Sequence, residues 1–505
     1  MSRKQRELNR ALDAADSYAE WLQIANELDV DDGLDEWRED DTSSENYDWR
    51  LIRSRLRQVR QMRSNPEHGA KLRHHLRQGL HWNLGNLGNP ALYGVSRVGT
   101  KMLVHDYVNE IAETLVELAH RDDPAFPPDA KRRFFDELSQ SFGRSALMLS
   151  GGATLGLFHV GVVKSLYLEG LLPEVISGSS AGSIVAATLA SRPVDQAEIL
   201  LDPMNVYHNF WRLLPWRLWF RRGSVMDQGQ LRHALEQNIE DLTFAEAHER
   251  SGRIIDITVS PAGVNQPPRL LNYLTFPYLY LYEAILASCA VPLLFPPVML
   301  MTQDERGRRV PYMPLLRWVD GSLKSDLPTL RLRRLHNVNH FIVSQTNPHV
   351  LPFLSRREPG GEGIRNSARD FARSSVRGTA KGVVDLARNA MSGAGRTRKT
   401  LDVASSVLDQ EYRGNINIFP EISLWRYANV TSNPSVESLE RFIREGERAT
   451  WPRMEMIRNQ TVISQTLANC MTHLKAQQSV NPHQPDAPTA PRAARRPSLK
   501  VVRSK

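Results

Sequence analysis

The feature that most constrains this chain is the pentapeptide Gly-Ser-Ser-Ala-Gly at residues 178–182. A Gly-x-Ser-x-Gly pattern lets the central serine, Ser180, stand on a sharp turn between a strand and a helix. Gly178 and Gly182 carry no side chain, so they do not collide where the backbone folds back on itself. The pattern therefore predicts an exposed serine hydroxyl at the end of a buried strand.

The surrounding residues give this turn a context. Short apolar runs at 146–149 and 175–177 are typical of buried strands, and the first ends abruptly in glycines. Residues 157–170 have helical periodicity, and residues 181–190 have a small-residue composition suited to packing on a sheet. This alternation predicts an α/β fold with a parallel sheet flanked by helices and a site at the strand ends.

A second glycine-rich loop, at residues 151–156, precedes the first of these helices. It could bind a dinucleotide phosphate, but its spacing is not Gly-x-Gly-x-x-Gly, and Gly170 stands where an acidic ribose-binding residue is expected. It could instead donate backbone N–H groups to an oxyanion, helped by the positive end of a helix dipole. A purely structural turn is the third interpretation, and the serine turn that follows favours the oxyanion.

The serine needs a base, and no histidine has a suitable strand-end context. His159 lies just inside the helix after the glycine loop, and the other histidines fall in helical or polar stretches. Asp320 is a better candidate, because the apolar pair at 318–319 leads into an Asp-Gly-Ser turn that would leave its carboxylate at a strand end.

Together with residues 287–296 (Ala-Ser-Cys-Ala-Val-Pro-Leu-Leu-Phe-Pro), these motifs resemble the patatin-like phospholipase family in type and order. The resemblance implies a patatin-like sheet and a Ser-Asp dyad without histidine. Ser180 would be the nucleophile and Asp320 the general base. The oxyanion hole would be formed by the amides of Gly151, Gly152 and Ala153. No cofactor and no metal are implied.

Two departures from the family pattern point to a subgroup. Leu155 stands where many members carry a basic residue, and the aspartate motif reads Asp-Gly-Ser. The chain resembles the intracellular triacylglycerol lipases of fungal and plant oil droplets, whose patatin domain follows a helical domain. That likeness rests on residues 80–86, 89–93, 98–100 and 342–349.

Composition and patterning predict six segments. They are a charged N-terminal segment (1–14), a mainly helical N-terminal domain (15–140), a patatin-like catalytic domain (141–350), a basic Gly/Ser/Arg-rich linker (351–400), a helical C-terminal extension (401–473) and a disordered basic Pro/Ala-rich tail (474–505).

The expected cellular location follows from the cysteine content and from the lack of a secretory signal and of a long apolar run. The sequence has two cysteines, a charged N-terminus without a secretory signal, and no run of eighteen uninterrupted apolar residues. Residues 279–301 come nearest, but a glutamate and three prolines interrupt them, so we expect core and acyl pocket there. The expected location is cytoplasmic, with peripheral association with membrane or lipid droplets.

The net charge of +8 is unevenly distributed. Residues 355–400 hold eleven Lys/Arg against four Asp/Glu, and residues 474–505 hold seven against one. These segments are either a solvated linker and tail or are attracted to an anionic lipid surface. Neither interleaves aromatic residues with its charges, so we expect no nucleic-acid partner.

An aromatic and basic stretch at residues 210–222 suits a membrane or droplet surface, where aromatic rings lie at headgroup depth. The alternative is that its rings pack on the N-terminal domain while its arginines face water. The possible lipid-interface residues are Trp211, Trp216, Arg217, Trp219, Phe220, Arg221 and Arg222.

These observations predict a lipid acyl-ester hydrolase that forms an acyl-serine, with triacylglycerol as the leading substrate. The alternatives are a phospholipase A or lysophospholipase, a lipid transacylase, and, in a different class, a non-catalytic lipid-granule scaffold. The expected partner is lipid substrate at a membrane or droplet surface. The sequence identifies no protein partner.

Overall fold

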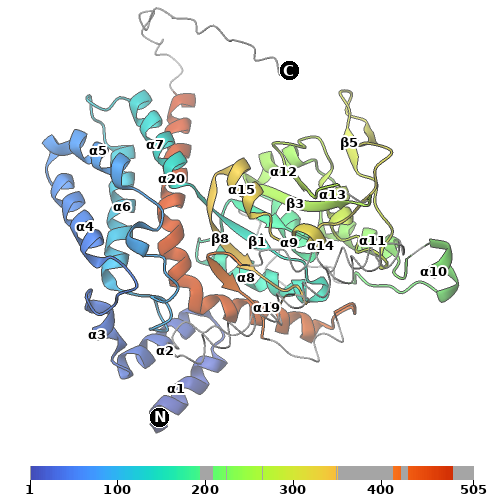
Figure 1. Ribbon diagram of the computed structural model, residues 1–505, viewed down its shortest axis with the longest axis horizontal. Helices are drawn as coiled ribbons and strands as arrows, with labels where there is room; N and C mark the ends of the chain where they lie inside the picture. The colour runs from blue at the N-terminus through green and yellow to red at the C-terminus, as the bar shows by residue number, and fades with distance from the viewer. Residues whose placement is uncertain are drawn as a thin grey trace, which may run out of the picture.

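A computed structural model describes residues 2–193, 209–222, 224–263, 266–348, 350, 413–421 and 430–480. The predicted linker at 351–400 lies outside these residues, as do 401–412, 422–429 and 481–505. Within the described residues, a helical N-terminal bundle stands beside an α/β unit, and a long C-terminal helix runs between them (Figure 1). The predicted α/β class with a helical N-terminal domain is confirmed.

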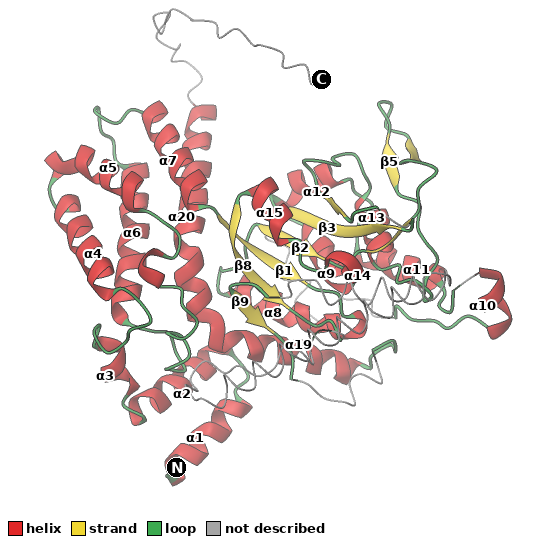
Figure 2. Ribbon diagram, viewed as in Figure 1, coloured by secondary structure: helices red, strands yellow, loops and turns green. Residues whose placement is uncertain are grey.

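The α/β unit is built on a seven-stranded sheet within the described chain, drawn in yellow in Figure 2. Five strands run parallel, in the order β3-β2-β1-β8-β9, and β4 and β7 each pair antiparallel with β3. The strands are β1 (Arg144–Leu149), β2 (Val175–Gly178), β3 (Ile254–Pro261), β4 (Arg269–Leu271), β7 (Trp318–Asp320), β8 (Val338–Ser344) and β9 (Ile416–Ile418). A separate hairpin pairs β5 (Met301–Gln303) with β6 (Arg309–Pro311).

The register of the central strands decides where the site lies. Leu149 at the end of β1 is level with Gly178 on one side and with Ser344 on the other. The loops that follow β1, β2 and β8 therefore leave the sheet at the same edge, which is where α/β proteins place their ligands. Both faces of these strands are buried, which explains their continuous apolar sequences.

Helices cover the sheet and surround the site. Those of the α/β unit are α8 (Phe158–Leu168), α9 (Ala181–Ala190), α10 (Trp216–Arg222), α11 (Gln228–Asn238), α12 (Phe244–Ser251), α13 (Leu281–Ser288), α14 (Ser322–Ser325) and α15 (Thr329–His336). A 3₁₀ turn, η3 (Ala153–Leu157), joins the glycine loop to α8. A Cβ on Gly156 of this turn would overlap Ala181, so the glycine lets the turn approach α9 closely.

The N-terminal bundle is helical as predicted. It contains α1 (Arg3–Ala14), α2 (Tyr18–Asp31), α3 (Leu34–Glu39), α4 (Trp49–Arg63), α5 (Gly69–Gly79), α6 (Met102–His120) and α7 (Pro128–Phe142), with 3₁₀ turns η1 (Pro66–His68) and η2 (Leu84–Asn86). Ser17 and Asp48 cap α2 and α4 with their side chains. In the asparagine-rich loop after α5, Asn86 and Asn89 both donate to the carbonyl of Asn46, which gives that motif a structural role.

The C-terminal extension joins the two parts. It contributes β9, α19 (Val436–Thr450), η7 (Trp451–Arg453) and α20 (Met454–Val480). Helix α20 packs against α6, α7 and β1. The predicted start of the disordered tail at 474 falls inside α20, because Leu474 is buried in the core and prolongs the helix packing.

No helix in the described ranges combines the length and the apolar character needed to cross a membrane. The apolar stretch at 279–301 contains α13, whose residues are all buried, and the loop after it reaches the site.

Candidate active site

Ser180 stands between β2 and α9 in a strained conformation, with φ 49° and ψ −120°. The turn is tight because the amide of Ser179 donates to the carbonyl of Leu149 at 3.0 Å. A Cβ on Gly178 would overlap the backbone of Gly182, and one on Gly182 would overlap the backbone of Leu149. Both glycines are therefore required by close backbone approach, as the pentapeptide pattern indicated.

Asp320 ends β7, which pairs with β3 so that Asp320 lies opposite Val259. Its side chain is 1% exposed, and its Oδ1 accepts a hydrogen bond from the Ser322 amide at 2.7 Å. The other oxygen, Oδ2, is buried and accepts no hydrogen bond within the described chain. Burial raises the pKa of Asp320 to about 6, against the lowering effect of Ser322 and of the nearby Ser180 hydroxyl. The structure thus brings a serine hydroxyl near a buried carboxylate that has one oxygen without a hydrogen bond in the described chain.

The glycine loop lies over this pair. A Cβ on Gly151 would sit 3.4 Å from the Cβ of Ser180. The amides of Gly152 and Ala153 donate to no acceptor in the described part of the chain. The amide of Gly151, however, donates to Asp326 Oδ1 at 2.9 Å. The prediction for Gly151 is corrected accordingly: its N–H is already bonded, so Gly152 and Ala153 remain as candidate oxyanion donors.

Two supporting residues were missed by the sequence analysis. Buried Asp326 holds the Gly151 amide and also accepts from Asn347 Nδ2 at 3.2 Å. Burial raises the pKa of Asp326 to about 7, and the charge of Asp320 contributes. Ser288 accepts from the Ser180 amide at 2.9 Å and donates to the Thr258 carbonyl at 2.8 Å, which fixes the serine turn to β3. Ser288 lies in the quoted 287–296 motif, whereas no pattern marks Asp326.

The hydrogen bonds of His159 and His248 go to residues other than Ser180 and Asp320. His159 is fully buried, with Nε2 donating to the Ser150 carbonyl at 3.0 Å and Nδ1 within 2.7 Å of Ser344 Oγ. Burial lowers the pKa of His159 to about 4, so the ring is neutral and braces the loop after β1. His248 donates to the Arg253 carbonyl, and His208 lies outside the described residues.

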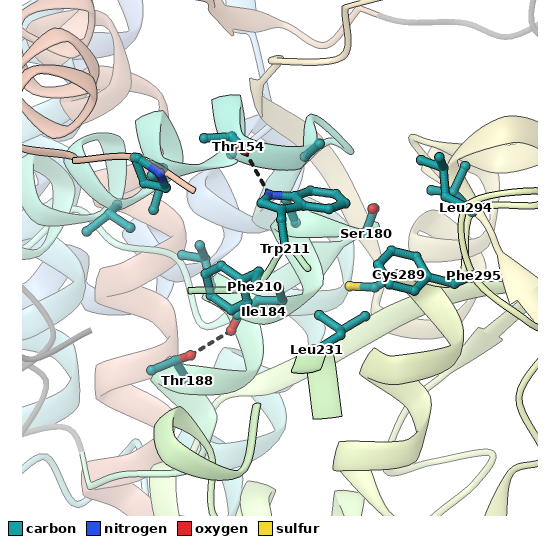
Figure 3. A pocket seen from close by; sticks show the side chains of 18 of the residues that line it. Thr154, Ser180, Ile184, Thr188, Phe210, Trp211, Leu231, Cys289, Leu294 and Phe295 are labelled. Atoms are coloured by element: carbon teal, nitrogen blue, oxygen red, sulfur yellow. Dashed lines mark hydrogen bonds between the residues drawn. The ribbon is translucent and has the colours of Figure 1, made fainter. Parts of the chain in front are cut away.

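An apolar cavity opens from Ser180 between α8, α9 and the loop after α13 (Figure 3). The side chains that line the cavity include Ile184, Trp211, Leu231, Phe295 and buried Cys289. Such a cavity suits a hydrocarbon chain, since nearly every wall is apolar. Among the described residues no group of three or more His, Cys, Asp or Glu side chains is arranged to hold a metal.

The predicted lipid-interface residues separate into two sets. On α10, Trp216 is 66% exposed and Trp219 38% exposed, and the Arg217 guanidinium lies 5.7 Å from the Trp216 ring centre. Trp211 instead lines the cavity, because its Nε1 donates to Thr154 Oγ1 at 2.9 Å. The side chains of Phe220, Arg221 and Arg222 lie outside the described part of the chain.

A serine on a strained strand-to-helix turn, a buried aspartate and free loop amides over an apolar cavity define a serine ester hydrolase of the α/β class. Two family models match the chain: "Domain of unknown function (DUF3336)" at residues 1–140 and "Patatin-like phospholipase" at residues 147–333. The chain belongs to the patatin-like phospholipase family, as its motifs indicated.

Its curated relatives include three with closely related names. The chain is 34% identical to "Triacylglycerol lipase ptl3" of Schizosaccharomyces pombe, over 93% of this chain and 98% of that one. It is 35% identical to "Triacylglycerol lipase 4" of Saccharomyces cerevisiae over 92% of this chain, and 33% identical to "Triacylglycerol lipase SDP1L" of Arabidopsis thaliana over 91%. It spans about half of these last two relatives, 53% and 58% of their lengths.

Proposed function

We propose that the protein is a triacylglycerol lipase that works at the surface of lipid droplets or membranes. One observation carries the chemistry: buried Asp320 lies close enough to Ser180 for its hydroxyl to lower the Asp320 pKa, Oδ2 of Asp320 accepts no hydrogen bond within the described chain, and Ser180 lines an apolar cavity. The names of the relatives support triacylglycerol as the substrate.

In the first half of the reaction, Ser180 Oγ attacks the ester carbonyl carbon while its proton passes to Asp320. The carbonyl oxygen becomes an oxyanion held by the amides of Gly152 and Ala153. The C–O bond to the alcohol then breaks, and the leaving oxygen takes the proton from Asp320. An acyl-serine remains, with its chain in the apolar cavity.

In the second half, water attacks the acyl-serine. Asp320 takes a proton from the water, the oxyanion forms again, and the bond to Ser180 Oγ breaks as the proton returns to the serine. Fatty acid leaves and the starting state is restored. A carboxylate is a weaker base than imidazole, and burial compensates by raising the pKa of Asp320 towards the working pH.

The substrate assignment is tested by fatty-acid release from emulsified trioleoylglycerol and from dioleoylphosphatidylcholine vesicles, compared at equal interfacial area. We expect release from triacylglycerol that is lost in Ser180→Ala. Preference for the vesicles would indicate a phospholipase, and oleate transfer to added monoacylglycerol would indicate a transacylase. Lipid binding without any release would favour a scaffold.

Helix α10 supports docking on the lipid surface, since it projects from the α/β unit (Figure 1) and exposes Trp216 and Trp219. Leu293 is exposed and lies on a loop near α10, because its carbonyl accepts a hydrogen bond from the Val225 amide. The next residue, Leu294, lines the cavity. Leu293 thus places an exposed apolar side chain next to the cavity lining, and arginines on α10 favour an anionic interface.

Replacing Trp216 and Trp219 together with alanine is expected to weaken binding to lipid emulsions or anionic vesicles by about tenfold or more, because each ring loses its apolar burial in the interface. Sedimentation with vesicles measures the binding, and hydrolysis of soluble p-nitrophenyl acetate should persist. Leu330→Ala, which removes an apolar side chain on α15 that is 57% exposed, is the control. Parallel loss of acetate hydrolysis would indicate that the tryptophans pack within the protein instead.

A further inference from the structure

The loop before α19, residues 430–434, lies beyond both family models yet reaches the cavity. The amide of Thr154 donates to the Val430 carbonyl at 3.1 Å, and Thr154 Oγ1 donates to the Ser432 carbonyl at 2.9 Å. Pro434 lines the cavity itself. The loop therefore holds the residue that follows Ala153, at the candidate oxyanion donors.

Asn433 makes the most specific contact of this loop. Its Oδ1 accepts from the Trp211 amide at 2.8 Å, and its Nδ2 donates to the Trp211 carbonyl at 2.8 Å. One side-chain amide thus satisfies both backbone groups of one residue, as a neighbouring strand would. Aspartate has no donor to offer the carbonyl, and alanine reaches neither group.

The indole of Trp211 completes a closed set of contacts. Its Nε1 donates to Thr154 Oγ1, drawn as a dashed line in Figure 3, and its ring lies 5.9 Å from the ring of Phe295. Hydrogen bonds join the Asn433 side chain to the Trp211 backbone and the Trp211 indole to Thr154. A third joins Thr154 to Ser432, the residue before Asn433, and closes the set. Trp211 is consequently fixed as a wall of the cavity beside the nucleophile.

The loop has a rigid base. Ser435 caps α19 by accepting from the Ser438 amide. Helix α19 crosses α8 so closely that a Cβ on Gly161 would overlap the Ile443 carbonyl, and one on Gly446 would overlap the Phe158 carbonyl. Since α8 begins directly after the glycine loop, the base of the Asn433 loop is tied to the same helix as the oxyanion donors.

We propose that Asn433 is a positioning residue that fixes Trp211 as a wall of the acyl cavity, so that the C-terminal extension sets acyl-chain selectivity. This inference rests on the proposed acyl-ester hydrolysis. Long chains contact the indole wall over several methylenes, whereas an acetyl group contacts it little. A loosened Trp211 therefore penalises long chains selectively.

The test compares kcat and KM for p-nitrophenyl acetate, butyrate and octanoate at concentrations below micelle formation. In Asn433→Ala we expect the octanoate-to-acetate ratio of kcat/KM to fall about tenfold, the scale on which pocket contacts discriminate between chains. The change should appear mainly as a higher KM for octanoate. Asn433→Asp, which keeps the acceptor but sets an oxygen against the Trp211 carbonyl, should lower the ratio at least as far.

The Trp211→Ala background separates positioning from a general structural role. There, Asn433→Ala should change the ratio no further, because its effect is transmitted through the absent indole. An unchanged ratio in both Asn433 variants, or an equal drop in the Trp211→Ala background, would overturn the inference. These outcomes are distinct from failure of the lipase proposal, in which the wild-type protein releases no fatty acid from either lipid.

Discussion

Replacement of Asp320 by asparagine is expected to lower kcat/KM for ester hydrolysis by a factor on the order of 10³, within the range that a general base contributes. Asparagine can still accept from the Ser322 amide through its carbonyl oxygen, but it cannot take the Ser180 proton. The loss should therefore be one of chemistry with the fold retained. Initial rates on p-nitrophenyl butyrate and the unfolding temperature measure the two separately.

The pH dependence gives a second signature of the same residue. The folded-state pKa of Asp320 is raised from 3.8 to about 6, and the base must be ionised to work. Wild-type kcat/KM should therefore be flat above pH 6 and fall towards tenfold per pH unit below it. The residual activity of Asp320→Asn should lack this acid limb.

The raised pKa of Asp320 also predicts a pH dependence of stability that is opposite in sign to that of most aspartates. Because the folded state holds the proton of Asp320 more tightly than the unfolded state, ionisation above pH 6 disfavours folding. Asp320→Asn should then unfold at a higher temperature than the wild type at pH 8, with the difference shrinking as pH falls through 6 towards 4. Asp241→Asn, on the surface beside Arg309, is the control. Full activity in Asp320→Asn, or an acid limb that survives in it, would remove Asp320 from the role of base.

Gly152→Ala is expected to lower kcat by about 10²- to 10³-fold, the cost of losing one oxyanion donor. The φ of Gly152 is −177°, outside the left-handed region, so the expected effect is argued from the contact that the new Cβ makes. The new Cβ would overlap Thr346 Oγ1 and lie 2.9 Å from Thr346 Cβ. The loop must move to relieve this overlap, which displaces the Gly152 amide, the proposed oxyanion donor.

Two further variants sharpen this test. Gly263→Ala adds a methyl group where no atom lies within 4 Å, so it should leave kcat unaltered. Adding Thr346→Ala to Gly152→Ala removes the nearest obstructing atom and should restore part of the rate. Burst kinetics with an activated ester report whether acyl transfer to Ser180 itself is slowed. If Gly152→Ala acylates at the wild-type rate, the oxyanion is held elsewhere.

The candidate site residues could be named from the sequence because each belongs to a local pattern. The turn at Ser180 requires glycines two residues either side, and the close backbone contacts of Gly178 and Gly182 show the physical reason. Asp320 was found by its place after an apolar pair, which forms β7. The antiparallel pairing of β7 with β3 was not predicted, because the sequence of a buried three-residue strand does not indicate whether its partner runs parallel or antiparallel.

What holds these residues in place was decided only by the tertiary structure. The Asp326 carboxylate lies 175 residues from the Gly151 amide that it binds, Ser288 lies 108 residues from Ser180, and Asn433 lies 222 residues from Trp211. Glycines in a loop show that its amides can be approached, but whether an amide is free depends on a carboxylate from elsewhere in the chain. In the same way, an aromatic residue in a basic stretch is either exposed, like Trp216, or a cavity wall, like Trp211, according to the polar groups that the fold places beside it. Local backbone requirements can be predicted from neighbouring residues in the sequence. Hydrogen-bond partners come from residues far apart in the chain, so only the folded structure shows them.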